Sequence, residues 1–413
     1  MGEKMEILDT KDIKSTILTA RKLTVEDVKQ FNDLLRYVFQ VTNDELSSLG
    51  WEDFEMEQEK APVLKNANVI GWFDGERLTS QVAVYSMHVN IHGKIFAMGG
   101  ITGVGTYPEY SGLGLVKGIL MKSLEEMKNN SQTISYLYPY SIPYYRKKGW
   151  EIISDVMSFT IKDTQLPKKV EVSGYVSRLE QDNEDVREVY DKFARKSHGS
   201  LIRADLEWSE YFRWDSDEML AAVYYDEDKA PQGFMFYWLE NETLYVKEII
   251  YLNQEARHGL WNFIGAHFSM INEVRGKIYE DQAIAFLLDD SEITETIKPY
   301  YMARIVDVQS FLTLYPFKDT SRPFHFIVED DLLEWNNGVF SVYFNEEESA
   351  TVSRKEALGK PVKLNINTLT TMLMSYRSPT YLCEIGRIET DNATLKILEK
   401  IIPSEEAYFS DFF

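Results

Sequence analysis

Hydrophobic and polar positions along the chain predict helices and strands in an order that occurs twice. In the first segment, Phe31, Leu34, Leu35 and Val38 recur at the spacing of one helix face, behind Thr24 as the helix cap. Alternating strand patterns follow over 69–73, 78–92 and 94–107. After them come a glycine-rich turn, a helix over 115–129 and strands over 133–140 and 150–161. This order predicts a mixed α/β sheet.

The second segment repeats that order more faintly. Its predicted elements are a helix over 182–194, strands over 219–225, 233–240 and 243–252, and a helix over 260–272. Placing Gly259-Leu260 over Gly114-Leu115 brings the two strand–turn–helix units into register. The sequence therefore predicts a duplicated fold.

A third segment of strands followed by two helices ends in an unusually aromatic tail, Ala407–Phe413. Burial of its three phenylalanines would fix a terminus that normally frays. We expect three domains, over residues 1–162, 172–316 and 320–413.

Composition narrows the class of protein. A chain of 413 residues with 44% hydrophobic residues can build several cores, and it has no apolar run near the roughly 20 residues that span a bilayer. The single cysteine, Cys383, excludes an internal disulfide, and the six histidines show no metal-ligand spacing. We expect a cytoplasmic protein without a metal site and without a membrane partner.

The net charge of −22 repels nucleic acid and attracts cations, although solubility alone also accounts for it. No nucleic-acid partner is expected, and a cationic substrate fits the charge.

The stretch Gly99–Leu115 carries the strongest chemical signal. Its glycine-rich turn joins a strand to a helix, so that backbone N–H groups can converge on an anion at the helix N-terminus. No Gly-Lys-Ser/Thr follows, which excludes a P-loop, and the preceding antiparallel strands argue against a dinucleotide fold. A tight turn without a ligand is the alternative.

This stretch resembles motif A of the GNAT family of N-acetyltransferases. Ser111, Leu113 and Val116 depart from its usual Arg/Gln-x-x-Gly-x-Gly/Ala pattern, while Lys117 and Arg146-Lys147-Lys148 offer positive charge nearby. The resemblance implies acetyl-CoA as co-substrate. It places the pantetheine arm on Val104, Gly105 and Thr106, the pyrophosphate on Gly112, Leu113, Gly114, Leu115, Val116 and Lys117, and further contacts on Tyr140 and Ser141.

Downstream, Pro143–Trp150 resembles the GNAT signature Tyr-x-Lys-x-Gly-Phe. Tyr145 then stands where many members place the general acid that protonates the departing thiolate. A phenol with a pKa near ~10 can protonate a thiolate with a pKa of ~8.5 when the two are within hydrogen-bond reach. The alternative is a packing role, as for most of the 25 tyrosines.

Nearly the whole chain resembles the enhanced intracellular survival (Eis) family. In the third segment, Leu332–Gly338, the Gly386-Arg387-Ile388 run and Asp411-Phe412-Phe413 carry the likeness. The resemblance implies an α/β (α+β) architecture of tandem GNAT folds, the second degenerate, followed by a domain like sterol carrier protein. It further implies direct acetyl transfer to an aminoglycoside-, polyamine- or lysine-like amine, the α-carboxylate of Phe413 as base, and a hexamer. A catalytically inactive CoA- or lipid-binding protein is the alternative.

Overall fold

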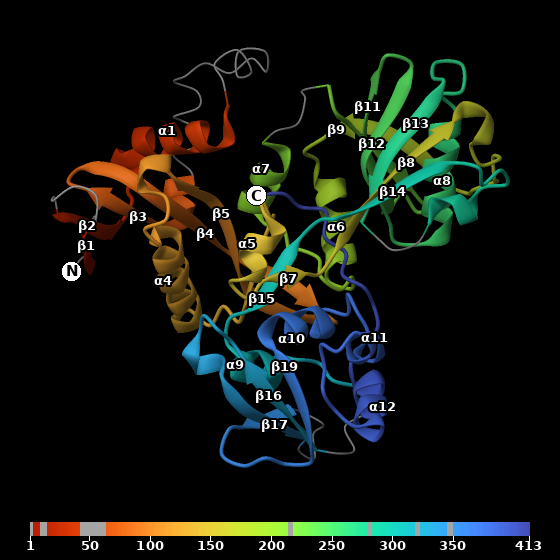
Figure 1. Cartoon of the computed structure of the whole chain (residues 1–413). Coiled ribbons are helices and arrows are strands. Elements are labelled where there is room, and N and C mark those ends of the chain that lie inside the picture. The colour runs from red at the N-terminus through yellow and green to blue at the C-terminus, as the bar shows by residue number, and fades with distance from the viewer. Residues whose placement is uncertain are drawn as a thin grey trace.

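The computed structural model describes residues 3–8, 15–41, 63–213, 218–279, 283–318, 323–344 and 350–413. Its elements form three lobes, and the C-terminus lies between the first two (Figure 1). No helix in these ranges is long and apolar enough to cross a bilayer. The domain boundary expected at 320 falls outside the described residues.

The first lobe is built on a mixed sheet in which β5 and β6 are parallel and the other neighbours antiparallel. In spatial order its strands are β1 (Glu3–Leu8), β2 (Ser15–Lys22), β3 (Ala67–Asp74), β4 (Arg77–Ile91), β5 (Lys94–Thr106), β6 (Ile134–Leu137), β15 (Met302–Ile305) and β7 (Glu151–Ile152). Its helices are α1 (Val28–Phe39), α4 (Leu115–Asn129) and α5 (Ile142–Arg146). The predicted strands over 69–107 and the helix over 115–129 are confirmed.

The second lobe has the same plan. In spatial order its strands are β14 (Thr294–Pro299), β8 (Asp155–Lys162), β13 (Glu273–Ile278), β12 (Thr243–Tyr251), β11 (Pro231–Glu240), β10 (Leu220–Tyr225) and β9 (Tyr175–Glu180). Its helices are α6 (Glu184–Ala194), α7 (Asp205–Phe212) and α8 (Gln254–Gly265). Because β12 and β13 are parallel, as β5 and β6 are, the two lobes match in topology.

The two large sheets exchange strands. The single strand predicted over 150–161 is instead two strands, because the chain leaves the first sheet after β7 and enters the second as β8. In return β15, which follows the second lobe in the sequence, pairs between β6 and β7 of the first sheet. The expected boundaries at 162 and 316 therefore leave one strand of each sheet in the other domain's range.

The third lobe packs a small sheet against helices. Its strands lie in the order β18 (Ala350–Ser353), β17 (Gly338–Phe344), β16 (Phe324–Glu329) and β19 (Lys360–Asn365), and its helices are α9 (Val308–Leu314), α10 (Ile366–Leu373), α11 (Pro379–Glu384) and α12 (Asn392–Ile401). Asp391 caps α12 by accepting the N–H of Thr394. The core is filled by the lobe's own side chains, among them Phe326, Phe340 and Leu369.

Candidate active site

Strand β5 continues past the end of its parallel neighbour β6. Their pairing runs only from Met98–Ile134 to Ile101–Leu137, whereas β5 extends to Thr106. The register with β4 shifts at Gly103, whose φ of 59° only glycine adopts easily. The free edge of β5, Val104–Thr106, therefore presents backbone groups that can bind an extended ligand as a further strand would.

Helix α4 follows β5 in the sequence through a turn that contains Gly112 and Gly114. Gly112 and Gly114 have φ of 83° and 76°, and no side chain caps the helix. A Cβ atom on either glycine would meet open space, so the backbone conformation alone requires glycine there. The first-turn N–H groups remain for an external anion, and Lys117 lies on that turn. This geometry suits a diphosphate.

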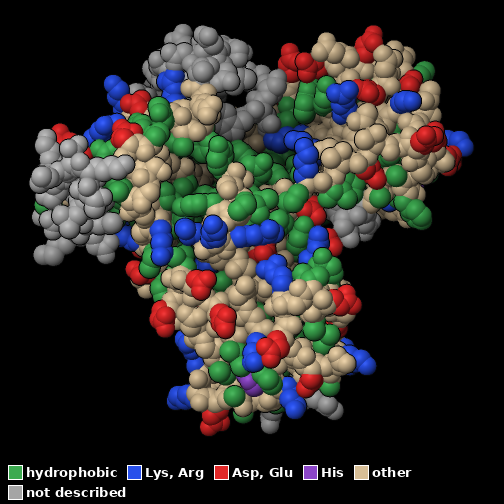
Figure 2. Space-filling model, in the orientation of Figure 1, with side chains coloured by type: hydrophobic (Ala, Val, Ile, Leu, Met, Phe, Trp, Pro, Cys, Tyr) green, Lys and Arg blue, Asp and Glu red, His purple; other side chains and the backbone are tan. Residues whose placement is uncertain are grey.

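Ammonium groups gather beside this helix terminus. Burial lowers the pKa of Lys148, and the charges of Lys117 and Lys147 lower it further, so the three side chains lie close together. The Lys148 ammonium lies 4.8 Å from the centre of the Tyr144 ring. Figure 2 shows lysine and arginine side chains in a row across this face, below a band of hydrophobic side chains. The lysines supply positive charge where Ser111 does not.

Tyr145 lies on α5, directly after the end of β6. Its ring packs edge-on against Tyr144 and Trp150, with centroids 5.2 and 6.1 Å away. Burial raises the pKa of the phenol, so it keeps its proton at neutral pH. Tyr140 and Ser141 lie in the connection from β6 to α5, where Tyr140 is 83% exposed and Ser141 is the residue before the helix.

The C-terminal tail, Ala407–Phe413, enters the first lobe and ends there. The Phe413 ring covers Gly100 of β5 so closely that a Cβ atom on that glycine would lie 2.8 Å from it. The ring packs against Tyr85 and Tyr301, and its backbone N–H donates to the Tyr301 hydroxyl at 3.3 Å. Phe409 and Phe413 are buried but Phe412 is 46% exposed, so the expected burial of all three phenylalanines is wrong for Phe412.

Tyr145 and Phe413 lie on opposite faces of the first sheet. On β5, Gly99 faces Met127 of α4, whereas its neighbour Gly100 faces Phe413. Tyr145 belongs to the hydrophobic cluster on the α4 face, and Phe413 belongs to the cluster on the other face. The two candidate catalytic groups therefore belong to opposite sides of the sheet, and Phe413 lies next to the last residues at which β5 pairs with β6.

The second lobe closes its corresponding helix terminus with its own side chain. Asn253 caps α8 by accepting the N–H of Ala256 at 2.8 Å. The predicted start of this helix at Leu260 is wrong by about one and a half turns. The prediction set Gly259 over Gly114, whereas the residue that begins the helix is the cap Asn253. Gly259 lies inside the helix, where a Cβ atom would lie 2.2 Å from the Tyr224 ring. It serves helix–sheet packing, unlike Gly114.

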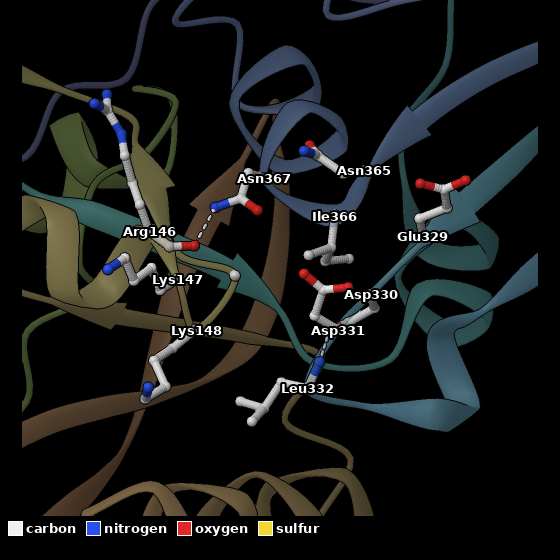
Figure 3. A pocket seen from close by; sticks show the side chains of 11 residues that line it. Arg146, Lys147, Lys148, Glu329, Asp330, Asp331, Leu332, Asn365, Ile366 and Asn367 are labelled. Atoms are coloured by element: carbon white, nitrogen blue, oxygen red, sulfur yellow. Dashed lines mark hydrogen bonds between the residues drawn. The ribbon is translucent and has the colours of Figure 1, made fainter. Parts of the chain in front are cut away.

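A pocket of about 140 Å³ lies beside the turn that follows Tyr145. Figure 3 shows Lys147 and Lys148 on one side of it and Asp330, Asp331 and Leu332 of the third lobe on the other. The Asn367 amide donates to the backbone oxygens of Arg146 and Trp150, at 3.0 and 2.8 Å. The third lobe thus supports the turn that carries the lysines.

A buried ion cluster of Arg203, Glu248 and Asp411 joins the second lobe to the C-terminal tail, and no motif in the sequence predicted it. A signal was present, because Glu248 falls at a buried position in the alternating pattern of β12. A carboxylate at such a position indicates a buried ionic partner.

Family comparisons agree with this geometry. Residues 19–153 and 199–305 each match an acetyltransferase (GNAT) domain, and residues 308–410 match a sterol carrier protein domain. The chain is a GNAT-family acetyltransferase. The tandem GNAT fold with a C-terminal sterol-carrier-protein-like domain is confirmed, and acetyl-CoA is the co-substrate that the GNAT domains imply.

Solved structures share the three-lobed fold of this GNAT acetyltransferase over 96% of its chain. A probable N-acyltransferase from Enterococcus faecalis V583 is 27% identical with a TM-score of 0.87, and 99% of its chain is covered. A GCN5-related N-acetyltransferase from Anabaena variabilis (23%, TM-score 0.83) and Eis1 from Mycobacterium abscessus (16%, TM-score 0.79) are covered over their full length. No curated protein matches the sequence.

Proposed function

We propose that the chain transfers the acetyl group of acetyl-CoA directly to a cationic amine, with Tyr145 as general acid and the α-carboxylate of Phe413 as base. The observation that carries this proposal is the placement of these two residues on opposite faces of the sheet, with Phe413 beside the end of the pairing between β5 and β6. An amine can then approach from one side and a thiol can leave on the other.

The residues present fit acetyl-CoA, which supplies the acetyl group as a thioester. The α4 N-terminus with Gly112–Lys117 would bind the diphosphate, and the free edge of β5 would bind the pantetheine amides. Tyr140 and Ser141 lie in the connection from β6 to α5, next in the sequence to the helix that carries Tyr145.

Each catalytic residue moves one proton. The Phe413 carboxylate accepts a proton from the substrate ammonium, which frees the nitrogen lone pair for attack on the carbonyl carbon. When the C–S bond breaks, the Tyr145 hydroxyl donates its proton to the sulfur, and the second proton that the nitrogen loses as the amide forms restores the phenol. Burial raises the pKa of this phenol, so it still carries the proton that the sulfur takes up.

The surroundings of Phe413 support a cationic substrate. Tyr138 and the half-exposed Phe412 form an edge-to-face pair with centroids 5.2 Å apart, next to Tyr300 and Tyr301. Aromatic faces attract ammonium groups, and the net charge of −22 draws cations to the protein. Aminoglycosides, polyamines and lysine side chains all carry such groups.

The direct test follows free thiol released from acetyl-CoA with polyamines, aminoglycosides and lysine peptides, on protein without a C-terminal tag. Turnover with one of these amines supports the proposal. Absence of both turnover and CoA binding would contradict it. The hexamer and the cytoplasmic location remain predictions; light scattering after size exclusion checks the hexamer.

A tag that extends the chain beyond Phe413 turns the α-carboxylate into a neutral peptide bond. We expect the acetylation rate to fall by at least about 100-fold, the usual contribution of a general base. The same tag on the N-terminus is the control and should leave the rate unchanged. Full activity of the C-terminally tagged protein would remove Phe413 from the mechanism.

A further inference from the structure

A buried ion cluster joins the C-terminal tail to the second lobe. The Arg203 guanidinium donates to Asp411 at 2.7 Å and to Glu248 at 3.3 Å, and also to the Ser410 hydroxyl at 3.0 Å. The three charged side chains have at most 3% exposed surface. Buried charges at this depth persist only when each has a partner, and the shorter of the two contacts from the Arg203 guanidinium to a carboxylate is the one to Asp411 of the tail.

Tyrosines surround the cluster and satisfy its remaining groups. The hydroxyls of Tyr211 and Tyr408 each donate to Glu248 at 2.8 Å, one to each carboxylate oxygen. The Arg203 guanidinium lies 3.8 Å from the ring centres of Tyr190 and Tyr211. Since Tyr408 and Asp411 both belong to the tail, the second lobe holds the tail at two points.

The cluster lies where the second lobe would have its own transfer site. In β12 the last residue that pairs with the parallel strand β13 is Val246. The register with β11 shifts at the next residue, Lys247, and Glu248 follows it. In β5 the corresponding shift at Gly103 comes two residues after the last pair with β6 and is followed by the free edge. The tail thus docks in the second lobe near the position that corresponds to the proposed acetyl-CoA site of the first.

Backbone contacts carry the restraint from Asp411 to Phe413. The Tyr300 hydroxyl donates to the Asp411 carbonyl oxygen at 2.9 Å, and the Phe413 N–H donates to the Tyr301 hydroxyl at 3.3 Å. The peptide units on both sides of Phe412 are therefore fixed, which leaves the terminal residue little freedom.

We propose that the degenerate second GNAT domain serves as the holder of the C-terminal tail, and that Arg203, Glu248 and Asp411 are positioning residues for Phe413. This inference rests on the proposed function, in which Phe413 supplies the base. It gives the second domain a role in a reaction that takes place in the first.

The test is the isosteric variant Asp411→Asn, which removes one charge of the cluster. We expect kcat to fall about 10- to 100-fold while KM for acetyl-CoA changes less than about twofold, because a displaced base affects chemistry and leaves cofactor binding intact. Carboxypeptidase A, followed by mass spectrometry, should release the terminal phenylalanines faster than from the wild type. The control Asp191→Asn breaks the half-exposed Arg195–Asp191 pair of the same domain and should change neither readout.

A second arm separates positioning from a merely structural role. On the C-terminally extended protein, Asp411→Asn should cause no further loss of the residual rate, because it acts through the carboxylate that the extension has already removed. Equal losses in both backgrounds, or an unchanged kcat and unchanged carboxypeptidase resistance, overturn the inference. If Asp411→Asn does not fold, Arg203→Lys is measured in the same way. Inactive wild-type protein, or a fully active extended protein, contradicts the proposed function, while the carboxypeptidase arm still tests whether the cluster holds the tail.

Discussion

Individual residues of the first lobe were predictable because motifs fix their local geometry. The spacing around Tyr145 sets a short helix after β6, and that helix buries the phenol. Glu248 was not recognised, because its partners Arg203 and Tyr408 are 45 and 160 residues away in the sequence. Burial of its strand could be inferred from the alternation of apolar residues, but the identity of the partners required the tertiary structure.

At this scale, Tyr145→Phe removes the proposed acid and keeps the ring. We expect the acetylation rate to fall about 100-fold, since general acids contribute about 10²- to 10⁴-fold, with CoA affinity and thermal stability nearly unchanged. Steady-state thiol release and calorimetric CoA titration give the two readouts. The matched control is Tyr144→Phe on the adjacent, partly exposed ring, which should retain the wild-type rate. Equal rates for Tyr145→Phe and wild type would assign Tyr145 to packing alone.

Among the elements, α4 and α8 show why one duplicated helix can bind an anion and the other cannot. Both follow the long central strand of their sheet, but α4 begins at Gly114 without a side-chain cap whereas Asn253 caps α8. The sequence indicated both helices. It placed the start of α8 too late, because Gly259 was read as the counterpart of Gly114 when its small size serves packing on Tyr224.

The substitution Gly112→Ala tests the turn before α4. A side chain at a φ of 83° costs roughly 1–2 kcal/mol, so we expect CoA to bind about tenfold more weakly. Gly118→Ala, inside α4, is the control: its Cβ atom would make an ordinary 3.6 Å contact with Trp72, and alanine favours the helix by up to about 1 kcal/mol. Calorimetric titration with CoA compares the two. Equal affinities would show that the turn does not bind the cofactor.

Across the whole molecule, the three lobes meet at a stacked histidine pair that no local pattern indicated. The rings of His92 from the first lobe and His198 from the second lie 3.5 Å apart, and they contact Ser375 and the Met374 oxygen of the third. His198 accepts the backbone N–H of His92, which fixes its neutral form. Two residues separated by 106 positions came together only through the packing of separate domains.

Acid should weaken this junction. Burial lowers the pKa of His198 to about 4, and burial together with the charges of His198 and Lys318 lowers that of His92. Because both values lie below the unfolded pKa of ~6.5, their contribution to stability is complete above that pH and is lost as pH falls toward 4, by about 1.4 kcal/mol per unit for each histidine. Urea unfolding at pH 7, 6 and 5 measures this. His92→Phe should flatten the dependence and the exposed His88→Gln should not; equal slopes would contradict the assignment.

The exchange of β8 and β15 between the two sheets restricts how such a chain can evolve. A gene deletion that removed the second acetyltransferase domain between its sequence boundaries would also remove β15, and so leave a gap between β6 and β7 of the first sheet. Recombination at the junction after Lys162 would take β8 from the second sheet in the same way. The duplicated copy can therefore lose its own chemistry by point substitution, but it cannot be discarded as a block. The second domain can therefore persist without an activity of its own. The chain passes through this domain to reach β15, and β15 completes the first sheet.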